Sequence, residues 1–110
     1  MKVTILMKSR PCKDEARRVL QMAEDMLAQG HNVSLYLLQE AVRLCSSNSK
    51  CSDFEKLKTL VEKDLQVYVL THDAKLRGIA VPSGDLGILE GSYEALVDLM
   101  ESCDRVVGIL

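Results

Sequence analysis

Residues 2–38 read KVTILMKSRPCKDEARRVLQMAEDMLAQGHNVSLYLL, and this stretch decides the fold class. Residues 2–7 are a short apolar run with β-branched side chains, which is typical of a strand buried on both faces of a sheet. Apolar residues then recur at helical spacing as far as Gly30, where glycine tolerates the left-handed backbone that follows a helix end. Residues 32–38 are a second apolar run. The stretch therefore predicts a strand, a helix and a second strand.

The rest of the chain repeats this alternation. One or two helical turns are expected at 39–44, followed by a polar loop at 45–52. Ser52 and Glu55 have the spacing of a capping box, which predicts the start of a helix. The apolar stripe of that helix is Phe54, Leu57, Leu60 and Val61.

Further elements follow toward the carboxyl terminus. They are an apolar strand at 65–71, a short helix at 73–78 closed by Gly78, a short strand at 87–90, a helix capped by Ser92 and a last strand at 104–110. The helix after Ser92 is expected to turn Leu96, Val97 and Met100 toward the core.

Strands that alternate with crossover helices give a parallel sheet between helical layers. We therefore predict an α/β fold, a three-layer α/β/α sandwich with a mostly parallel sheet of about five strands. The chain has 110 residues, 47% of them apolar. Residues 1–110 are expected to form a single domain with a substantial core.

Composition argues against two classes of function. The net charge is −2 and aromatic residues make up 4% of the chain, so no nucleic-acid partner is predicted. No apolar run approaches the ~18 residues of a membrane span. Lys2 and Lys8 interrupt the first apolar run, unlike a signal peptide. We expect a cytoplasmic protein whose cysteines are thiols, ligands or redox groups sooner than structural disulfides.

Standard cofactor and catalytic motifs are missing. There is no phosphate-binding loop of the GxxxxGK type, and Gly84, Gly87 and Gly91 lack the spacing of a dinucleotide site. No serine lies in a GxSxG motif, and neither CxxC nor HExxH is present. No cofactor is therefore predicted.

Reactive groups are expected where the strands end, because ligands collect beyond the carboxyl ends of strands in open sheets. The loops at 8–12, 39–52 and 71–77 qualify, and they hold three of the four cysteines. The candidate reactive thiols are Cys12, Cys45 and Cys51. The candidate binding residues are Arg10, Lys13, His72 and Asp73.

Cys12 lies at the amino terminus of the first predicted helix. The positive end of that helix, together with Arg10 and Lys13, favours a thiolate and a pKa below the ~8.5 of a free cysteine. Asp14 and Glu15 act in the opposite direction. The alternative is a small capping residue without reactivity.

The other candidates also keep alternatives open. Cys45 and Cys51 fit resolving thiols, a reversible disulfide or metal ligands. Cys12, Cys45, Cys51 and His72 would supply the four ligands of a zinc site, although their spacing is not a known zinc pattern. His72 either points to solvent or shares a proton with a thiol. Cys103 is expected to pack in the core.

Three stretches resemble the DsrE/TusD-like (DsrE/DsrF-like) sulfur-relay family. VYVLTHDAKLRGI at 67–79 is similar to the family's apolar strand, turn and short helix that ends in Arg-Gly-Val/Ile. GSYEALVDLMESCDRVVGIL at 91–110 is similar to its last helix and strand. MLAQGHNVSLYLLQEAV at 26–42 fits its helix, glycine and strand. The similarity spans nearly the whole chain.

The resemblance implies a small α/β domain that assembles as a trimer or hexamer. Active members carry a persulfide on a cysteine at the end of the third strand and pass the sulfur to a partner. The matching position here is Leu70, or Thr71 with a shift of one residue, and neither side chain carries sulfur. Because we expect the first and third strands to be neighbours, Cys12 is well placed to replace that cysteine.

We therefore predict a sulfurtransferase-type carrier in which Cys12 accepts sulfur as a persulfide and Cys45 or Cys51 resolves it. The expected partners are further copies of the chain, as a homotrimer or homohexamer, and other sulfur-relay proteins. One alternative is a non-catalytic subunit that keeps the fold after losing the strand-end cysteine. Another is a module that binds a metal or a small ligand.

Overall fold

The computed structural model describes residues 1–45, 52–79 and 87–108. All paired strands in these residues are parallel, and they form one sheet in the order β4-β3-β2-β1-β5. The strands are β1 (Lys2–Met7), β2 (Asn32–Leu37), β3 (Gln66–Leu70), β4 (Ile88–Gly91) and β5 (Arg105–Val107). The predicted five-stranded parallel sheet is confirmed.

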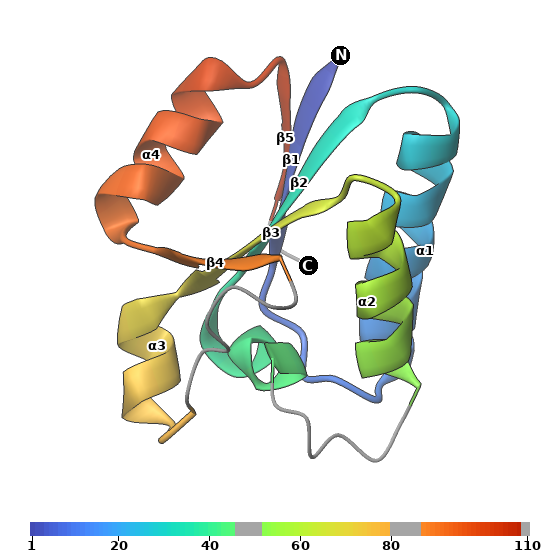
Figure 1. Ribbon diagram of the computed structural model, residues 1–110. Coiled ribbons are helices and arrows are strands. Elements are labelled where there is room, and N and C mark those ends of the chain that lie inside the picture. Colours follow the sequence, from blue (N-terminus) through green and yellow to red (C-terminus); the bar gives the residue numbers. More distant parts are fainter. Residues whose placement is uncertain (46–51, 80–86, 109–110) are drawn as a thin grey trace.

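The helices lie on both faces of this sheet (Figure 1). α1 (Asp14–Ala28) and α2 (Asp53–Glu62) cover one face, and α4 (Tyr93–Ser102) lies against the other. A 3-10 helix, η1 (Gln39–Cys45), follows β2, and α3 (Thr71–Leu76) follows β3. The predicted three-layer α/β/α sandwich is therefore confirmed. Within the described ranges, no helix has the length and apolar character needed to cross a membrane.

The larger core lies between the sheet and the first two helices. The buried side chains of α1 are Ala16, Val19, Leu20 and Ala23, which have the helical spacing that the sequence predicts. They pack with alternate residues of the strands, including Ile5 and Leu35, which are fully buried. Burying one such aliphatic side chain is worth about 1.5–3 kcal/mol relative to leaving it exposed.

A smaller core lies on the α4 side of the sheet. Its buried members are Leu6, Tyr36 and Leu70, and the Tyr36 ring stacks on Tyr68 with centroids 5.8 Å apart. The helix contributes Leu96 and Leu99 to this cluster, both only partly buried.

Two of the three side chains predicted to face inward from α4 are exposed. Val97 is 51% and Met100 is 38% exposed, whereas Leu96 packs on the sheet. Successive residues of a helix are rotated by about 100°, so the neighbours of Leu96 and Leu99 point away from the sheet. The prediction was wrong for Val97 and Met100.

The two predicted helix caps differ in the structure. Ser92 has extended backbone angles, and its side chain accepts a hydrogen bond of 3.0 Å from the Ala95 amide, as predicted. Ser52 has right-handed helical angles and its side chain caps nothing. A capping side chain reaches the first free amides from extended backbone, so the predicted capping box does not form.

The strand order changes one further prediction. β2 lies between β1 and β3, so the first and third strands are not neighbours. The segment that follows β2, η1, therefore stands between the loop after β1 and the helix after β3. The helix after β3, α3, begins at Thr71, directly after the strand. The sequence pattern predicts that this helix begins at residue 73.

Candidate functional site

Three segments of the chain come together at the carboxyl edge of the sheet. Met7, Leu37 and Val69 lie in register on adjacent parallel strands, so β1, β2 and β3 all point to this edge. The loop before α1, the η1 helix and the α3 helix follow these strands. This edge holds the candidate site.

Cys12 lies in the turn between β1 and α1. It is exposed and directly precedes Lys13, the N-cap of α1. Its φ is 70°, an uncommon value for a residue other than glycine. Its sulfur is disulfide-bonded, so a Cys12 thiolate forms only after reduction.

Asp53 holds the backbone of this turn. Its Oδ2 accepts a hydrogen bond of 2.7 Å from the Cys12 amide, and the residue is 2% exposed. Asp53 is the first residue of α2, where a carboxylate also interacts well with the positive end of the helix. Asp53 was not predicted from the sequence as a site residue. The available signal was an acidic residue in the first turn of the helix that follows the cysteine loop.

The other cysteines have different settings. Cys45 is the last residue of η1. Its side chain and the whole of Cys51 lie outside the described residues. Cys103 is a free, half-buried thiol with its Sγ 3.3 Å from the carbonyl oxygens of Met100 and Arg105. The predicted core position of Cys103 was wrong, because α4 ends at Ser102 and Cys103 has extended backbone angles.

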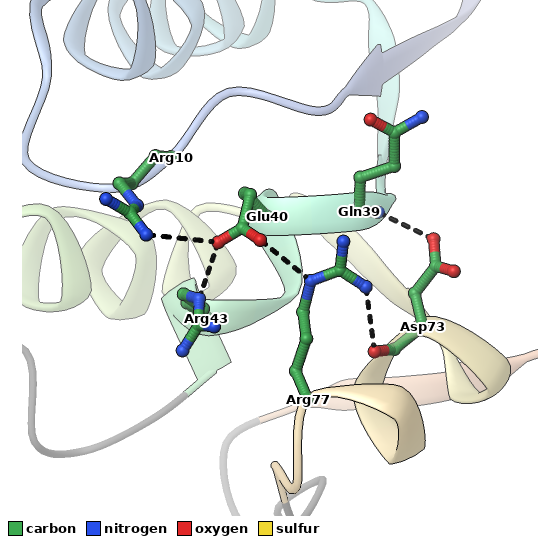
Figure 2. A network of polar contacts seen from close by, with 6 residues as sticks. All are labelled: Arg10, Gln39, Glu40, Arg43, Asp73 and Arg77. Carbon is green, nitrogen blue, oxygen red and sulfur yellow. Dashed lines mark hydrogen bonds and ion pairs between the residues drawn. The ribbon is translucent and has the colours of Figure 1, made fainter.

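Four charged side chains meet beside the Cys12 loop (Figure 2). The carboxylate of Glu40 on η1 accepts from Arg43 Nε at 2.6 Å and from Arg77 Nε at 3.1 Å. Arg10 Nη2, from the loop after β1, lies 3.6 Å from the same carboxylate. The network ties together the segments that follow three adjacent strands. Of its members, only Arg10 was predicted from the sequence as a candidate site residue.

The arginines determine the ionisation of Glu40. The hydrogen bond from Arg43, and then that from Arg77, lowers the pKa of the Glu40 carboxyl below its ordinary value of 4.5. Burial opposes this shift. Glu40 is therefore an anion at neutral pH, and it holds three cations around it.

Asp73 supports the same edge of the sheet from α3. Its Oδ2 accepts a hydrogen bond of 2.6 Å from the Gln39 amide, at a residue with φ of 49°. Its carbonyl oxygen accepts from Arg77 Nη1 at 3.2 Å. In the structure this candidate binding residue, which is buried, holds the start of η1 in place.

His72 lies on the other side of α3, beside a hollow of about 550 Å³. The hollow is lined by Leu70, Lys75, Glu90 and Tyr93 as well as His72, whose ring lies 5.9 Å from that of Tyr93. Leu70 is 2% exposed and occupies the position that the resemblance assigns to a cysteine. An apolar side chain therefore lies where that resemblance places the reactive sulfur.

The described residues contain no group of three or more His, Cys, Asp or Glu side chains arranged to hold a metal ion. Two of the four ligands suggested for zinc, Cys51 and the side chain of Cys45, lie outside the described residues. The zinc hypothesis therefore stays a prediction.

Comparison with known proteins adds to this geometry. The sequence profile of the DsrE/DsrF-like family matches residues 1–108. The chain belongs to this family. DsrE/DsrF-like proteins are a sulfur-relay family. The search of curated proteins found no match.

Solved structures share the fold. The crystal structure of the ychN protein from E. coli matches with a TM-score of 0.84 at 20% identity, covering 99% of this chain and 97% of that one. A conserved protein of unknown function, BT1422 from Bacteroides thetaiotaomicron, matches with a TM-score of 0.74 at 14% identity, covering 99% and 94% of the two chains. At these identities the likeness establishes the fold alone.

Proposed function

We propose that this DsrE/DsrF-like protein is a sulfurtransferase-type carrier that holds sulfane sulfur on Cys12 as a persulfide. The observation that carries the proposal is the setting of Cys12. It is exposed at the carboxyl edge of the sheet, and the buried Asp53 fixes its backbone. Leu70 removes the alternative position for a reactive sulfur, since a leucine side chain forms no persulfide.

The chemistry begins with reduction of the Cys12 disulfide by two equivalents of a cellular thiol, which leave as a disulfide. The Cys12 thiolate then attacks the outer sulfur of a donor persulfide. A new S–S bond forms on Cys12, the donor S–S bond breaks, and the donor leaves as a thiolate with the electron pair. An acceptor thiolate takes the outer sulfur by the same reaction.

Cys45 or Cys51 is proposed as the resolving thiol. Its thiolate attacks the inner sulfur of the Cys12 persulfide, so that a protein disulfide forms and hydrosulfide leaves. This step would leave Cys12 disulfide-bonded, and Cys12 is disulfide-bonded in the structure.

Neighbouring charges support a thiolate at Cys12. Lys13 and the amino terminus of α1 favour the anion, and Arg10, which also contacts Glu40, adds positive charge two residues before the sulfur. The carboxylates of Asp14, Glu15 and Asp53 act in the opposite direction. We keep His72 and Asp73 as proposed binding residues, with His72 facing the hollow and Asp73 holding η1.

Assembly and location are part of the same proposal. We expect residues 1–110 to act as one domain within a homotrimer or homohexamer in the cytoplasm, exchanging sulfur with other sulfur-relay proteins. The exposed apolar side chains of α4 support self-association, since Tyr93 and Val97 are each more than half exposed.

The test is intact-mass spectrometry of the reduced protein after exposure to a persulfide donor. We expect added sulfur on the peptide that carries Cys12, loss of loading in Cys12→Ser, and full loading in the matched control Cys103→Ser. Loading that survives Cys12→Ser would contradict the proposal.

A second function is a non-catalytic subunit that retains the fold and the assembly surface. Leu70 favours it, because the position of the family's cysteine holds no sulfur. On this alternative no cysteine loads, and Cys12→Ser matches the parent protein in fold, assembly and reactivity toward the donor.

A further inference from the structure

We infer that Arg10, Arg43 and Arg77 form a binding site for a compact, doubly charged oxyanion of the sulfate, thiosulfate or phosphate class. The three guanidinium groups come from the loop after β1, from η1 and from the end of α3, and they converge on the single carboxylate of Glu40 (Figure 2).

The arginines have donors to spare for such a ligand. Each guanidinium carries five N–H groups, and Glu40 engages one nitrogen of each. Arg77 also gives Nη1 to the carbonyl oxygen of Asp73. Among the described residues no hydrogen bond uses Nη1 or Nη2 of Arg43, and Arg10 has only its contact with Glu40. A planar guanidinium matches an oxyanion with two parallel hydrogen bonds.

The charge balance favours an anion. Three arginines face the carboxylates of Glu40 and Asp73, so the group keeps a net positive charge. Asp73 already accepts from the Gln39 amide, which leaves Glu40 as the carboxylate in contact with the guanidinium groups. The lowered pKa of Glu40 agrees with a positive environment.

The shape of the group favours a small ligand over an extended acidic peptide, because the guanidinium groups meet at one point. They are also accessible, since the side chains of Arg10 and Arg43 are 61% and 42% exposed. Arg77 is only 21% exposed, and its hydrogen bonds to Glu40 and Asp73 hold its guanidinium group in place.

Glu40 holds the three arginines together and repels the ligand. In Glu40→Gln the amide oxygen still accepts from the arginines, but the negative charge is gone. A dianion a few ångströms from that charge should bind about tenfold tighter after the substitution.

The test is a titration of the reduced full-length protein with sodium sulfate, sodium thiosulfate and sodium phosphate at constant ionic strength, followed by NMR shifts and calorimetry. We expect saturable binding that Arg77→Gln and Arg10→Gln each weaken by about tenfold. Arg105→Gln is the matched control: Arg105 lies beside Val3 at the opposite end of the sheet, and the affinity should not change. Thermal melts establish that each variant is folded.

The relative affinities distinguish the source of the ligand. Preference for thiosulfate over sulfate indicates a sulfur donor, and preference for phosphate indicates a phosphorylated ligand. Absence of saturable binding, or equal weakening by Arg105→Gln, overturns the site. The arginine variants could instead change association with another protein chain while the oxyanion affinity stays unchanged. That result would overturn the anion site and indicate a docking surface. The same titration on Cys12→Ser separates this inference from the proposed thiol chemistry, because the anion site requires no cysteine.

Discussion

The amide nitrogen of Cys12 lies 2.7 Å from Oδ2 of Asp53, across 41 residues of sequence. The bond joins the turn that carries the candidate sulfur to the first residue of α2, and Asp53 is 2% exposed. Hydrogen bonds to a charged group are worth about 1.5–3 kcal/mol. The position of Cys12 therefore depends on a helix from a later part of the chain.

Substitution of Asp53 tests this dependence. Asp53→Ala leaves the Cys12 amide without its acceptor and should destabilise the protein by about 1–3 kcal/mol. Asp53→Asn retains an acceptor oxygen and should cost less. Urea unfolding measures both. Equal unfolding free energies for Asp53→Ala and the parent protein would contradict the anchoring role.

The order of alkylation tests the states of the cysteines. Without reductant, Cys103 should react slowly with iodoacetamide because it is a half-buried free thiol, and Cys12 should not react because it is disulfide-bonded. After mild reduction, Cys12 should react faster than Cys103 because its residue is exposed. Peptide mapping reads out both stages. Labelling of Cys12 before any reduction would contradict this order.

Local patterns predicted the elements of the fold but not all of their contacts. The alternation of apolar runs and helical stripes located β1, α1 and β2, because burial against a sheet requires those periods. The order of the strands depends on long-range pairing. Local patterns carry no information on that pairing. The expectation that β1 and β3 are neighbours was therefore wrong, because β2 lies between them.

The candidate site was predictable only as a set of loops. The rule that chemistry collects at the carboxyl edge located Cys12 and Arg10. The partners of these residues, Asp53 and Glu40, are set by tertiary packing, and nothing in the spacing of the sequence connects them. The same applies to Cys103: an inward helical position predicts burial only while the helix continues, and α4 ends one residue earlier.

The pH dependence of stability should report on Glu40. Because the pKa of Glu40 is lowered in the folded state, its contribution is present above the unfolded pKa near 4.5 and is lost as the pH falls through the lower folded value. Glu40→Gln should therefore show a smaller fall in melting temperature below about pH 4.5. Glu24, whose pKa Lys56 lowers, acts in the same direction and remains in both proteins. Parallel pH profiles for the two proteins would contradict the prediction.

Gly91 tests the packing of the smaller core. A Cβ at this position would lie 2.8 Å from Cζ of Tyr36 and closer still to its hydroxyl. Tyr36 is fully buried and its hydroxyl donates to the Ser92 carbonyl oxygen at 2.6 Å, so it has little room to move. Gly91→Ala should cost about 1–3 kcal/mol of unfolding free energy. Gly108→Ala is the control, since its Cβ would meet no atom of the described residues within 4 Å. Equal stability of the two variants would be the contradictory result.

The exposed face of α4 tests the proposed assembly. Tyr93, Val97 and Met100 are 57%, 51% and 38% exposed on this helix. Leu89 and Val106, at the two edges of the same sheet face, are 49% and 37% exposed. Apolar surface is therefore exposed on α4 and on the sheet at both sides of this helix. We propose that a second copy of the chain buries this surface.

Val97→Glu should break this association, because a carboxylate buried in an apolar interface without a partner costs several kcal/mol. Light scattering of the parent protein at micromolar concentration should give the mass of a trimer or hexamer, and the variant should give a smaller mass with an unchanged circular dichroism spectrum. Leu76→Glu is the matched control, because Leu76 is an apolar side chain that is 68% exposed on α3 and not on α4. A monomeric parent protein would contradict the assembly, and an oligomer that tolerates Val97→Glu would show that the subunits meet through a different surface.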